Sequence, residues 1–518
     1  MINCHWFSGN RRKLNSTEQQ LEKSEKQNHR SEKPESVKIL RLWEMIFLGK
    51  GTLFRRVLHA IISIALRLFF RRIEATGIEK VPRSGAVIFV LNHPNGLIDP
   101  ALVYVSLARR VSFLAKSTIF SMKSAAFLMR ALEVLPVYRQ IDANLEMRKN
   151  FGTFEVCRAL LARNRCIAIF PEGISHDETE LQPLKTGAAR IALGALGIRG
   201  NGEVDSKSTI QNSKQIARRN DLAEKGLKIM TVGLYYTSKT AFRSEALIRY
   251  GETFDVEPVE LDKNGEPPRE AVRQLTDRIE TALRYVTLNL ETAEELDTVL
   301  KAEALFSSVY ENLLFKQTLS QSFLRLQDLA EKYRLLGQNN PEKMRELSEK
   351  IQRYESELAT SGVTATSLSV LQHPTAYVFR YLVLRQIVLI LLAPLSIVGA
   401  IIHSPAYLFS NLIGLMFKTH GADEAGSTYK ILAAMVFMPL TWLVVSAVVF
   451  WFFGWQFALL SVPIAILCGY VALRSFETLV DMRVWLKATW ILFRQRALFL
   501  RLLVERETLQ KEIEEIIK

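Results

Sequence analysis

Cysteine is scarce in this chain, and the few that it has are scattered. Cys4, Cys157, Cys166 and Cys468 show no metal-ligand spacing and form no even set within one region. Small secreted domains, in contrast, carry paired cysteines at close and regular intervals. The sequence therefore predicts a protein of a reducing compartment that has no structural disulfides, no metal site and no cofactor.

Also missing is an apolar stretch near the N-terminus. Residues 1–36 are polar and lack the apolar core of a signal peptide, so we expect a disordered tail. The net charge of +14 and the pI of about 9.5 favour an anionic partner. Because no nucleic-acid module is recognisable while long uncharged runs are present, we predict a membrane with anionic lipids, and no nucleic acid.

Two long stretches lack Asp, Glu, Lys and Arg altogether and define a predicted membrane region at 381–473. The second stretch, Ile431–Leu473, is long enough for two transmembrane helices, at 431–452 and 456–473. Its lack of mid-span charge disfavours a transporter. The alternative is a buried helical bundle in a soluble protein.

The first stretch, Gln386–Phe417, is too long for one straight span and too short for two, and it contains Pro394 and Pro405. A single crossing there would put the basic residues after 473 on the side opposite the catalytic domain, which the positive-inside rule disfavours. We therefore predict a re-entrant segment or hairpin at 386–417 in an integral membrane protein. The catalytic domain would face the cytoplasm, with a cytoplasmic amphipathic helix at 474–518.

The remaining regions are helical or alternate between strands and helices. Residues 37–74 mix basic and aromatic side chains, which predicts interfacial helices, with an ordinary packed helix pair as the alternative. Residues 300–360 predict a helical hairpin with its turn at 337–341. Residues 75–295 predict the catalytic domain, with a polar insertion at 199–226.

The predicted fold is an α/β domain with a mixed sheet flanked by helices, followed by the helical hairpin and the transmembrane region. Within the α/β domain, the predicted strands lie at 85–91, 111–115, 132–138, 165–170, 228–236 and 245–250, and the predicted helices at 100–110, 144–163, 185–197 and 268–290.

Two short polar segments each follow a strand-like run. The first is NHPNGLIDP at 92–100, and the second is FPEGISHD at 170–177. A histidine and a nearby aspartate at the exit of a buried strand form a general base for a hydroxyl nucleophile. His93 and Asp99 are therefore the candidate catalytic residues.

These segments resemble two blocks of the PlsC-like glycerophospholipid acyltransferases (glycerol-3-phosphate and 1-acylglycerol-3-phosphate acyltransferases), which read Asn-His…Asp and Phe-Pro-Glu-Gly. LEVLPVYR at 132–139, LKTGA at 184–188 and MTVGL at 230–234 are similar to further blocks, in order. The resemblance covers residues 75–255 and looks most like the eukaryotic-type glycerol-3-phosphate and dihydroxyacetone-phosphate acyltransferase branch.

The resemblance implies that His93 takes the proton of the acceptor hydroxyl while Asp99 orients the imidazole. The family has four residues between the two, whereas this chain has five. Positions six apart lie about 120° from each other on a helix, so we expect the turn formers at 94–96 to absorb the extra residue. Asp99 followed by Pro100 also fits a helix N-cap with proline at the first helical position, so capping alone is the alternative.

An acceptor that carries phosphate needs cations close to its binding site. The residues predicted to bind the acceptor or its phosphate are Arg139, Glu172, Gly173, Lys185 and Lys116. Arginine grips phosphate bidentately, and glycine permits close approach of the backbone. Glu172 positions the acceptor by resemblance only. For the three cations, plain surface charge is the alternative.

Two further details concern the loops. We expect backbone N–H groups around Asn95 and Gly96 to stabilise the oxyanion. His176 and Asp177 either orient the loop that contains Glu172 or belong to an ordinary turn.

The resulting prediction is a membrane-bound O-acyltransferase of phospholipid biosynthesis. It moves a fatty acyl group from acyl-CoA or an acyl-acyl carrier protein (acyl-ACP) to a hydroxyl of glycerol-3-phosphate or 1-acylglycerol-3-phosphate (lysophosphatidate), with the former slightly favoured. The alternatives are acylation of another lysophospholipid, or a catalytically inactive membrane scaffold or lipid-binding protein.

Overall fold

The computed structural model describes residues 52–517, with gaps at 122, 139–148, 200–221, 223, 225, 263–264, 311–317, 363–374 and 417–422. All the described residues belong to one compact unit, Leu42–Lys518. The predicted tail at 1–36, the segment 37–51 and most of the predicted insertion at 199–226 lie outside the described residues.

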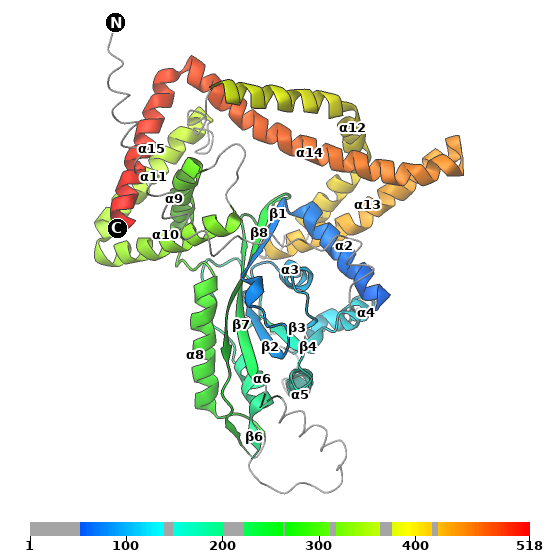
Figure 1. The fold of residues 1–518 in the computed structure, drawn as a ribbon, viewed down its shortest axis with the longest axis vertical. Coiled ribbons are helices and arrows are strands. Elements are labelled where there is room, and N and C mark those ends of the chain that lie inside the picture. The colour runs from blue at the N-terminus through cyan, green and yellow to red at the C-terminus, as the bar shows by residue number, and fades with distance from the viewer. Residues whose placement is uncertain are drawn as a thin grey trace. The chain divides into compact units, whose positions relative to one another are not determined.

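A seven-stranded sheet forms the core of the α/β domain (Figure 1). Its order is β1-β8-β7-β2-β5-β3-β4, and all neighbouring pairs are parallel except the antiparallel pair β7 and β8. The strands are β1 (Arg72–Thr76), β2 (Ala86–Leu91), β3 (Val111–Lys116), β4 (Leu135–Val137), β5 (Cys166–Ile169), β7 (Leu227–Tyr236) and β8 (Glu245–Asp255). A separate short pair joins β6 (Ile198–Arg199) to β9 (Glu260–Leu261). The predicted fold class, an α/β domain with a mixed sheet, is confirmed.

Helices cover both faces of the sheet, so that all six residues of the central strand β2 are buried. One face packs against α5 (Lys149–Leu161), α6 (Gly187–Leu196) and α8 (Arg269–Val286) in a single apolar cluster. On the other face, Ser106 of α3 (Ile98–Ser106) shares a hydrogen bond with Tyr250, whose ring packs against Phe89. Two short 3-10 helices, η2 (Ile78–Lys80) and η3 (Ser117–Ser121), and α4 (Lys123–Ala131) complete the domain.

The edge strand β1 was not predicted from the sequence. It pairs with β8 alone, and Ala75 is its single buried residue. An edge strand with one buried side chain shows no apolar alternation, so the periodicity that marks a strand is missing. Besides its backbone pairing, one ion pair joins it to β8, since Arg72 contacts Glu245 at 2.5 Å.

Four helices form a second apolar cluster: α9 (Ala293–Tyr310), α10 (Leu319–Asn339), α11 (Pro341–Ser361) and α15 (Arg496–Ile517). The hairpin predicted at 300–360 corresponds to α10 and α11, with Asn340 ending one helix and accepting from Lys343 N–H of the next. The prediction of one helix over 474–518 needs correction, because residues up to Arg494 continue α14 and Phe499 of α15 is buried in this cluster. The apolar stripe of an amphipathic helix can pack against a protein core or lie on a membrane surface, and the sequence pattern is the same in both cases.

Three apolar helices, α12 (Thr375–Met416), α13 (Asp423–Phe453) and α14 (Trp455–Arg494), make up the predicted membrane region. Each contains a segment long and apolar enough to cross a membrane: Phe379–Met416, Thr428–Phe453 and Trp455–Arg483. Their large apolar side chains are mostly exposed, Trp451 to 84%. A bundle buried inside a soluble protein would hide these side chains, so the exposure favours contact with lipid.

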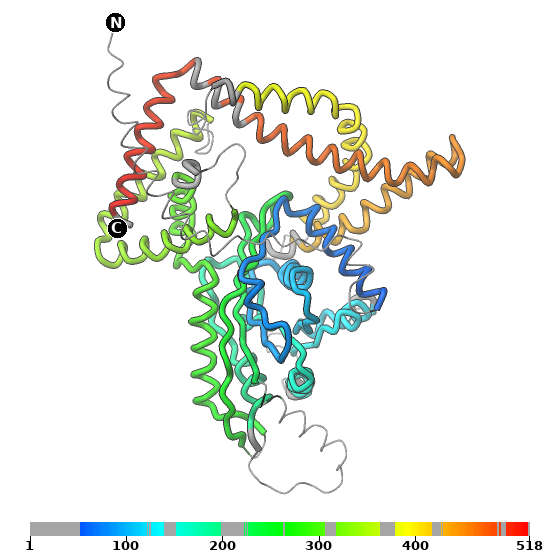
Figure 2. Tube along the Cα trace, in the orientation of Figure 1, coloured from blue at the N-terminus to red at the C-terminus, as the bar shows by residue number. Residues whose placement is uncertain are grey.

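At 386–417, where a re-entrant segment or hairpin was predicted, the structure has one helix that runs through Pro394 and Pro405. A hairpin of two helices is therefore not formed, and the re-entrant path stays a prediction. This helix, α12, changes direction part-way along its length (Figure 2). Proline removes a backbone hydrogen bond and kinks a helix, which accounts for the bend.

The middle of α12 lies beside the central parts of α13 and α14. His403 accepts a hydrogen bond from Trp442 Nε1 at 2.9 Å. Gly399 lies against the backbone carbonyl of Cys468, and a Cβ at this glycine would come within 2.0 Å of that oxygen. Trp442 and Cys468 are about equally far from Gly454, the turn between α13 and α14.

On both sides of this part of α12, the contacts are with residues farther from that turn. Ser396 Oγ donates to Ser475 Oγ at 2.7 Å, and Gly414 lies against the side chain of Lys430. Because helix length is proportional to residue number, the part of α12 around Gly399 and His403 is nearest the Gly454 turn, and the helix leads away from that turn toward Ser396 and toward Gly414.

The α/β domain is joined to the opposite end of that helix pair. Arg243, after β7, forms an ion pair with Glu477 of α14, and Arg71 contacts Asp481 at 2.8 Å. Arg243 also donates to three backbone carbonyls, at 67, 68 and 70, where α2 (Leu53–Phe69) ends. Residues 477–481 of α14, more than 20 positions after Gly454, therefore lie against the α/β domain.

Gly77→Ala should destabilise the fold more than Gly85→Ala. Both glycines have positive φ angles, of 71° and 85°, which cost an L residue about 1–2 kcal/mol. A Cβ at Gly77 would lie 2.1 Å from Tyr250 O, whereas nothing lies within 4 Å of one at Gly85. Thermal unfolding in detergent, followed by intrinsic fluorescence, measures the difference. Equal midpoints for the two variants would contradict the close approach.

Candidate active site

The two polar segments recognised in the sequence meet at the carboxyl ends of neighbouring parallel strands. β2 pairs with β5 from Val87–Cys166 to Val90–Ile169, so both chains leave the sheet at the same edge. His176 N–H donates to the carbonyl of His93 at 3.2 Å. Ligand sites of open α/β sheets lie at this edge.

His93 and Asp99 form the hydrogen-bonded pair that the sequence predicted. His93 Nδ1 lies 2.8 Å from Asp99 Oδ2, and the Asp99 side chain is fully buried. The imidazole stacks on the ring of Phe170, with centroids 4.1 Å apart. An ionised aspartate only accepts hydrogen bonds, so Nδ1 carries the proton and Nε2 is left to accept one. His93 lines the main pocket of the described part of the chain.

Capping does not explain the position of Asp99. Helix α3 begins at Ile98, so Leu97 holds the N-cap position and Pro100 is the third helical residue rather than the first. The carboxylate bonds to the preceding loop instead, since Asn95 N–H donates to Asp99 Oδ2 at 2.7 Å. The turn absorbs the extra residue as expected, with Gly96 at φ 48°.

The same hydrogen bond corrects the predicted oxyanion site. Because Asn95 N–H points at Asp99, it is not available to a reaction intermediate. Gly96 lines the pocket, so its proposed contribution stays a prediction.

Glu172 lies beneath the loops rather than in the pocket. Its carboxylate is fully buried and accepts hydrogen bonds from His93 N–H at 2.8 Å, from Gln182 N–H at 2.9 Å and from the ring of His176. This carboxylate is not among the described residues that line the pocket, where the family resemblance had implied contact with an acceptor. The structure instead has Glu172 holding the backbone of His93.

His176 and Asp177 orient this loop. The His176 ring holds Glu172, while Lys239 Nζ donates to the His176 carbonyl at 3.1 Å and to Asp177 at 2.7 Å. These contacts fit the loop-orienting alternative.

The pocket beside His93 has a volume of about 940 Å³ and a cationic end. Lys116 and Lys185, both predicted from the sequence, line it, as does Arg190, which was not predicted. Gly173, with φ 76°, leaves room for the Lys185 ammonium, since a Cβ there would lie 2.5 Å from Nζ. No Asp or Glu is among the described residues that line the pocket. Arg139 lies outside the described residues.

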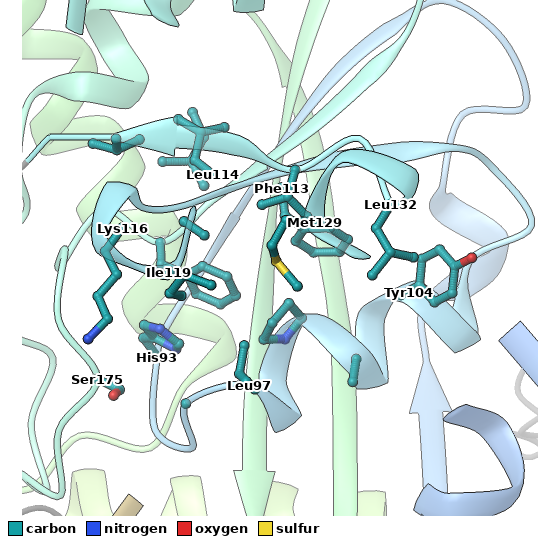
Figure 3. Close-up of a pocket in the computed structure, with 18 of the residues that line it drawn as sticks. His93, Leu97, Tyr104, Phe113, Leu114, Lys116, Ile119, Met129, Leu132 and Ser175 are labelled. Atoms are coloured by element: carbon teal, nitrogen blue, oxygen red, sulfur yellow. The ribbon is translucent and has the colours of Figure 1, made fainter. Parts of the chain in front are cut away.

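The rest of the pocket is apolar and extends away from His93. Figure 3 shows His93, Lys116 and Ser175 on one side of the cavity and Tyr104 and Leu132 on the other, with apolar side chains between them. Two walls come from segments that sequence reasoning did not connect with the site: Leu58, Ile62, Ala65 and Leu66 of α2, and Thr428, Tyr429, Ile431, Leu432 and Met435 at the start of α13.

Sequence reasoning also missed two residues that support the catalytic loop. The Asn92 side chain exchanges two hydrogen bonds with the backbone of Leu234, at 2.8 and 3.1 Å. The Tyr236 hydroxyl donates to Asp99 Oδ1 at 2.5 Å. Tyr236 ends a predicted strand, but no spacing rule links it to residues more than a hundred positions earlier.

Two buried cysteines of the α/β domain are poor nucleophiles. Burial raises the pKa of Cys157 to about 12 and that of Cys166 to about 11. Neither thiol is ionised at neutral pH, so neither supplies the thiolate that a covalent acyl-enzyme through cysteine requires.

Comparison with known families finds matches in two regions of the chain. The Acyltransferase family matches residues 72–209, which include His93, Asp99 and Glu172. The chain carries an acyltransferase domain. A second family, described as the glycerol-3-phosphate acyltransferase 2 C-terminal domain, matches residues 306–518.

Two yeast proteins are homologous to this acyltransferase chain. Glycerol-3-phosphate O-acyltransferase 1 of Saccharomyces cerevisiae is 25% identical over 494 residues, covering 76% of this chain and 61% of the yeast protein. Glycerol-3-phosphate O-acyltransferase 2 of the same yeast is 26% identical over 312 residues, covering 57% of this chain and 38% of the yeast protein. The chain thus spans about three fifths of the length of the first relative. The family resemblance seen in the motifs is confirmed.

A solved structure aligns with part of the chain. The 1-acyl-sn-glycerophosphate (LPA) acyltransferase PlsC from Thermotoga maritima matches 47% of this chain and 89% of its own length, at 17% identity and a TM-score of 0.28. The fold assignment therefore rests on the strand order and register described above.

Glu172→Gln should lower the turnover of the acyltransferase more than it weakens acceptor binding. The glutamine amide has the shape of the carboxylate, but its NH₂ group is a donor and faces N–H groups that also donate. The lost hydrogen bond costs about 1–3 kcal/mol and displaces His93. We expect kcat to fall about 10- to 100-fold, with a smaller change in KM for the acceptor. Steady-state acyl-transfer kinetics measures both constants.

Glu180→Gln is the matched control for this variant. Glu180 lies in the same loop and pairs at the surface with Arg284 at 2.9 Å, so its activity should equal that of the wild type. A rise in KM alone for Glu172→Gln would show that this carboxylate binds the acceptor directly.

Proposed function

We propose that this protein is a membrane-bound O-acyltransferase of glycerolipid synthesis that acylates a hydroxyl of glycerol-3-phosphate. The observation that carries the proposal is the position of the His93–Asp99 pair at a pocket with one cationic end and a large apolar part. The acceptor is supported by the names of the two yeast homologues. The donor is an acyl thioester, acyl-CoA or acyl-ACP.

The mechanism uses the acceptor's own hydroxyl as nucleophile. Its oxygen attacks the thioester carbonyl while His93 Nε2 takes the proton, a step that contributes roughly 10²–10⁴ in rate. Asp99 stabilises the imidazolium that forms. The tetrahedral intermediate then collapses, the carbon–sulfur bond breaks, and the thiolate leaves with the proton that His93 returns. The acyl group passes directly to the acceptor, so no acyl-enzyme forms.

The cationic end of the pocket suits the acceptor phosphate. Lys116, Lys185 and Arg190 place positive charge there, and Arg190 is itself held by Glu266 at 2.6 Å. Helix α6 starts at Gly187, and its first residues line the same end of the pocket. Free N–H groups at a helix N-terminus favour anions. Arg139 stays a predicted further ligand.

The apolar part of the pocket suits the fatty acyl chain. Helix α2 forms one wall, and another side of it carries six exposed apolar side chains at helical spacing: Leu53, Phe54, Val57, Ile61, Ile64 and Leu68. This pattern is typical of a helix that lies in a membrane interface. Helix α2 would then separate the acyl chain from the bilayer by the thickness of a single helix.

Acyl transfer by the purified full chain in liposomes tests the proposal. Labelled acyl-CoA is supplied with glycerol-3-phosphate or with lysophosphatidate, and His93→Ala serves as the negative control. We expect 1-acylglycerol-3-phosphate from the first acceptor and a loss of at least about 10³-fold in His93→Ala.

The other outcomes decide between the alternatives. Product from lysophosphatidate alone would show that lysophosphatidate, and not glycerol-3-phosphate, is the acceptor. Product that survives in His93→Ala would overturn the general-base role. No product with either acceptor and either donor class would favour another lysophospholipid acceptor or a scaffold.

We also propose that the α/β domain faces the cytoplasm and that α12 enters the bilayer without crossing it. In support, α12 leads away from the Gly454 turn on both sides of Gly399 and His403, and Ser396 on one of these sides contacts Ser475, close to the residue of α14 that pairs with the α/β domain. Helices α13 and α14 would then form the one hairpin that spans the bilayer.

Single cysteines in a cysteine-free background test this topology. Arg380→Cys and Met416→Cys lie at the two ends of α12, and Gln456→Cys lies just after the Gly454 turn. In sealed microsomes, a membrane-impermeant maleimide should label Arg380→Cys and Met416→Cys at once. It should label Gln456→Cys only after the membrane is permeabilised. If one end of α12 also needs permeabilisation, the helix crosses the membrane.

A further inference from the structure

Tyr236 touches the catalytic carboxylate from the side opposite His93. Its hydroxyl lies 2.5 Å from Asp99 Oδ1, whereas His93 Nδ1 and Asn95 N–H bind Oδ2 at 2.8 and 2.7 Å. Asp99 is fully buried, and Tyr236 is 8% exposed. The two oxygens of the carboxylate thus have different partners, and Tyr236 is the partner of the oxygen that His93 does not use.

The phenol of Tyr236 is a permanent donor. Its burial, reinforced by the charge of Asp99 and by the hydrogen bond to it, raises the pKa of Tyr236 well above the usual value of 10. The hydroxyl therefore keeps its proton throughout the pH range in which an acyltransferase works. A donor aimed at one oxygen fixes the rotation of the carboxylate, so that the other oxygen faces the imidazole.

The position of Tyr236 follows from the sheet. β7, β2 and β5 are neighbouring parallel strands that end at one edge. Tyr236 is the last residue of β7, and its ring packs against Phe70 with centroids 5.8 Å apart. Just beyond it, the Lys239 carbonyl accepts from the Asn95 side chain at 3.3 Å. The end of β7 therefore supports the whole loop between His93 and Asp99.

We propose that Tyr236 is a positioning residue that holds Asp99 and sets the basicity of His93. The inference rests on the proposed acyl transfer by His93 for its kinetic consequences. A hydrogen bond from the phenol spreads the negative charge of the carboxylate and so weakens its pull on the imidazolium. Tyr236 thereby keeps His93 unprotonated at lower pH than the His93–Asp99 pair would allow alone.

Other charged groups near the pair act from different directions. Glu172 binds the His93 backbone, and its carboxylate is occupied by its own three donors. The remaining titratable groups that face the loop or the pocket end are Lys116, Lys185, Arg190, His176 and Lys239. Among the described residues, the hydrogen bonds to the Asp99 carboxylate come from His93, Asn95 and Tyr236.

Tyr236→Phe removes this hydroxyl and keeps the ring. We expect kcat to fall about tenfold, with KM for the acceptor little changed because Tyr236 is remote from the pocket lining. In the plot of kcat/KM against pH, the fall in activity on the acid side (the acid limb) should shift to higher pH by about half to one pH unit. Without the phenol, Asp99 is more basic and stabilises the protonated form of His93 more strongly. A higher pH is therefore needed to remove the proton from Nε2.

Tyr250→Phe is the matched control. Tyr250 is equally buried in the neighbouring strand, and its hydroxyl is paired with Ser106, away from the site. This variant should keep the wild-type acid limb. If Tyr236→Phe lowers kcat but leaves the acid limb of kcat/KM at the wild-type pH, Tyr236 has only a structural role. That result would overturn the proposal.

A second measurement separates this proposal from the proposed function. Histidine NMR of the full chain in detergent, with the His93 signal assigned by its loss in His93→Gln, reports the pKa of His93 without any substrate. A raised value in Tyr236→Phe supports the positioning role even if the protein acylates a different acceptor. An unchanged value overturns it even if acyl transfer is found.

Incorporation of 3-fluorotyrosine at position 236 covers the case in which the phenylalanine variant is unstable. Fluorine makes the phenol a stronger donor while the ring and hydroxyl remain. The acid limb and the pKa of His93 should then move downward, opposite to the change in Tyr236→Phe. A shift in the same direction for both variants would contradict the proposal, because general disturbance of the loop predicts that result.

Discussion

The parallel pairing of β2 with β5 is the constraint on which the active site depends. Adjacent strands lie about 4.8 Å apart, and parallel strands end at the same edge, so the loops after Leu91 and Ile169 must share one small volume. That proximity lets the buried Glu172 carboxylate accept the His93 backbone N–H at 2.8 Å. Without it, the His93 backbone would lose the hydrogen bond that Glu172 accepts.

The strand β7 supplies the third side of this arrangement. It is parallel to β2 on the flank opposite β5, so its last residues reach the loop between His93 and Asp99. His93, the proposed general base, is thereby fixed at its backbone by Glu172 and at its ring by a carboxylate that Tyr236 holds in turn. Preorganisation of this kind keeps the base in place before substrate arrives, which is where much of the rate advantage of an enzyme originates.

The apolar helices contribute to the site as well as to membrane attachment. The start of α13 and one face of α2 line the pocket that His93 faces, while the other face of α2 is exposed and apolar. Arg243 binds both the end of α2 and Glu477 of α14, so one buried guanidinium ties the pocket wall to the apolar helices. The pocket and the apolar helices are therefore parts of one structure.

The sequence by itself determined the α/β class, the acyltransferase family, the apolar helices, and the pairing of His93 with Asp99. These features depend on local patterns, such as strand length, uncharged runs and short motifs, that the chain displays without folding. Tertiary structure alone decided the roles of Glu172 and Asn95, whose polar groups are occupied inside the protein, and the edge strand β1, which buries one residue. It also decided that α15 joins a helical core and that Tyr236 reaches Asp99. Such contacts join residues far apart in the chain, and a hydrogen bond between distant side chains leaves no periodic trace in a single sequence.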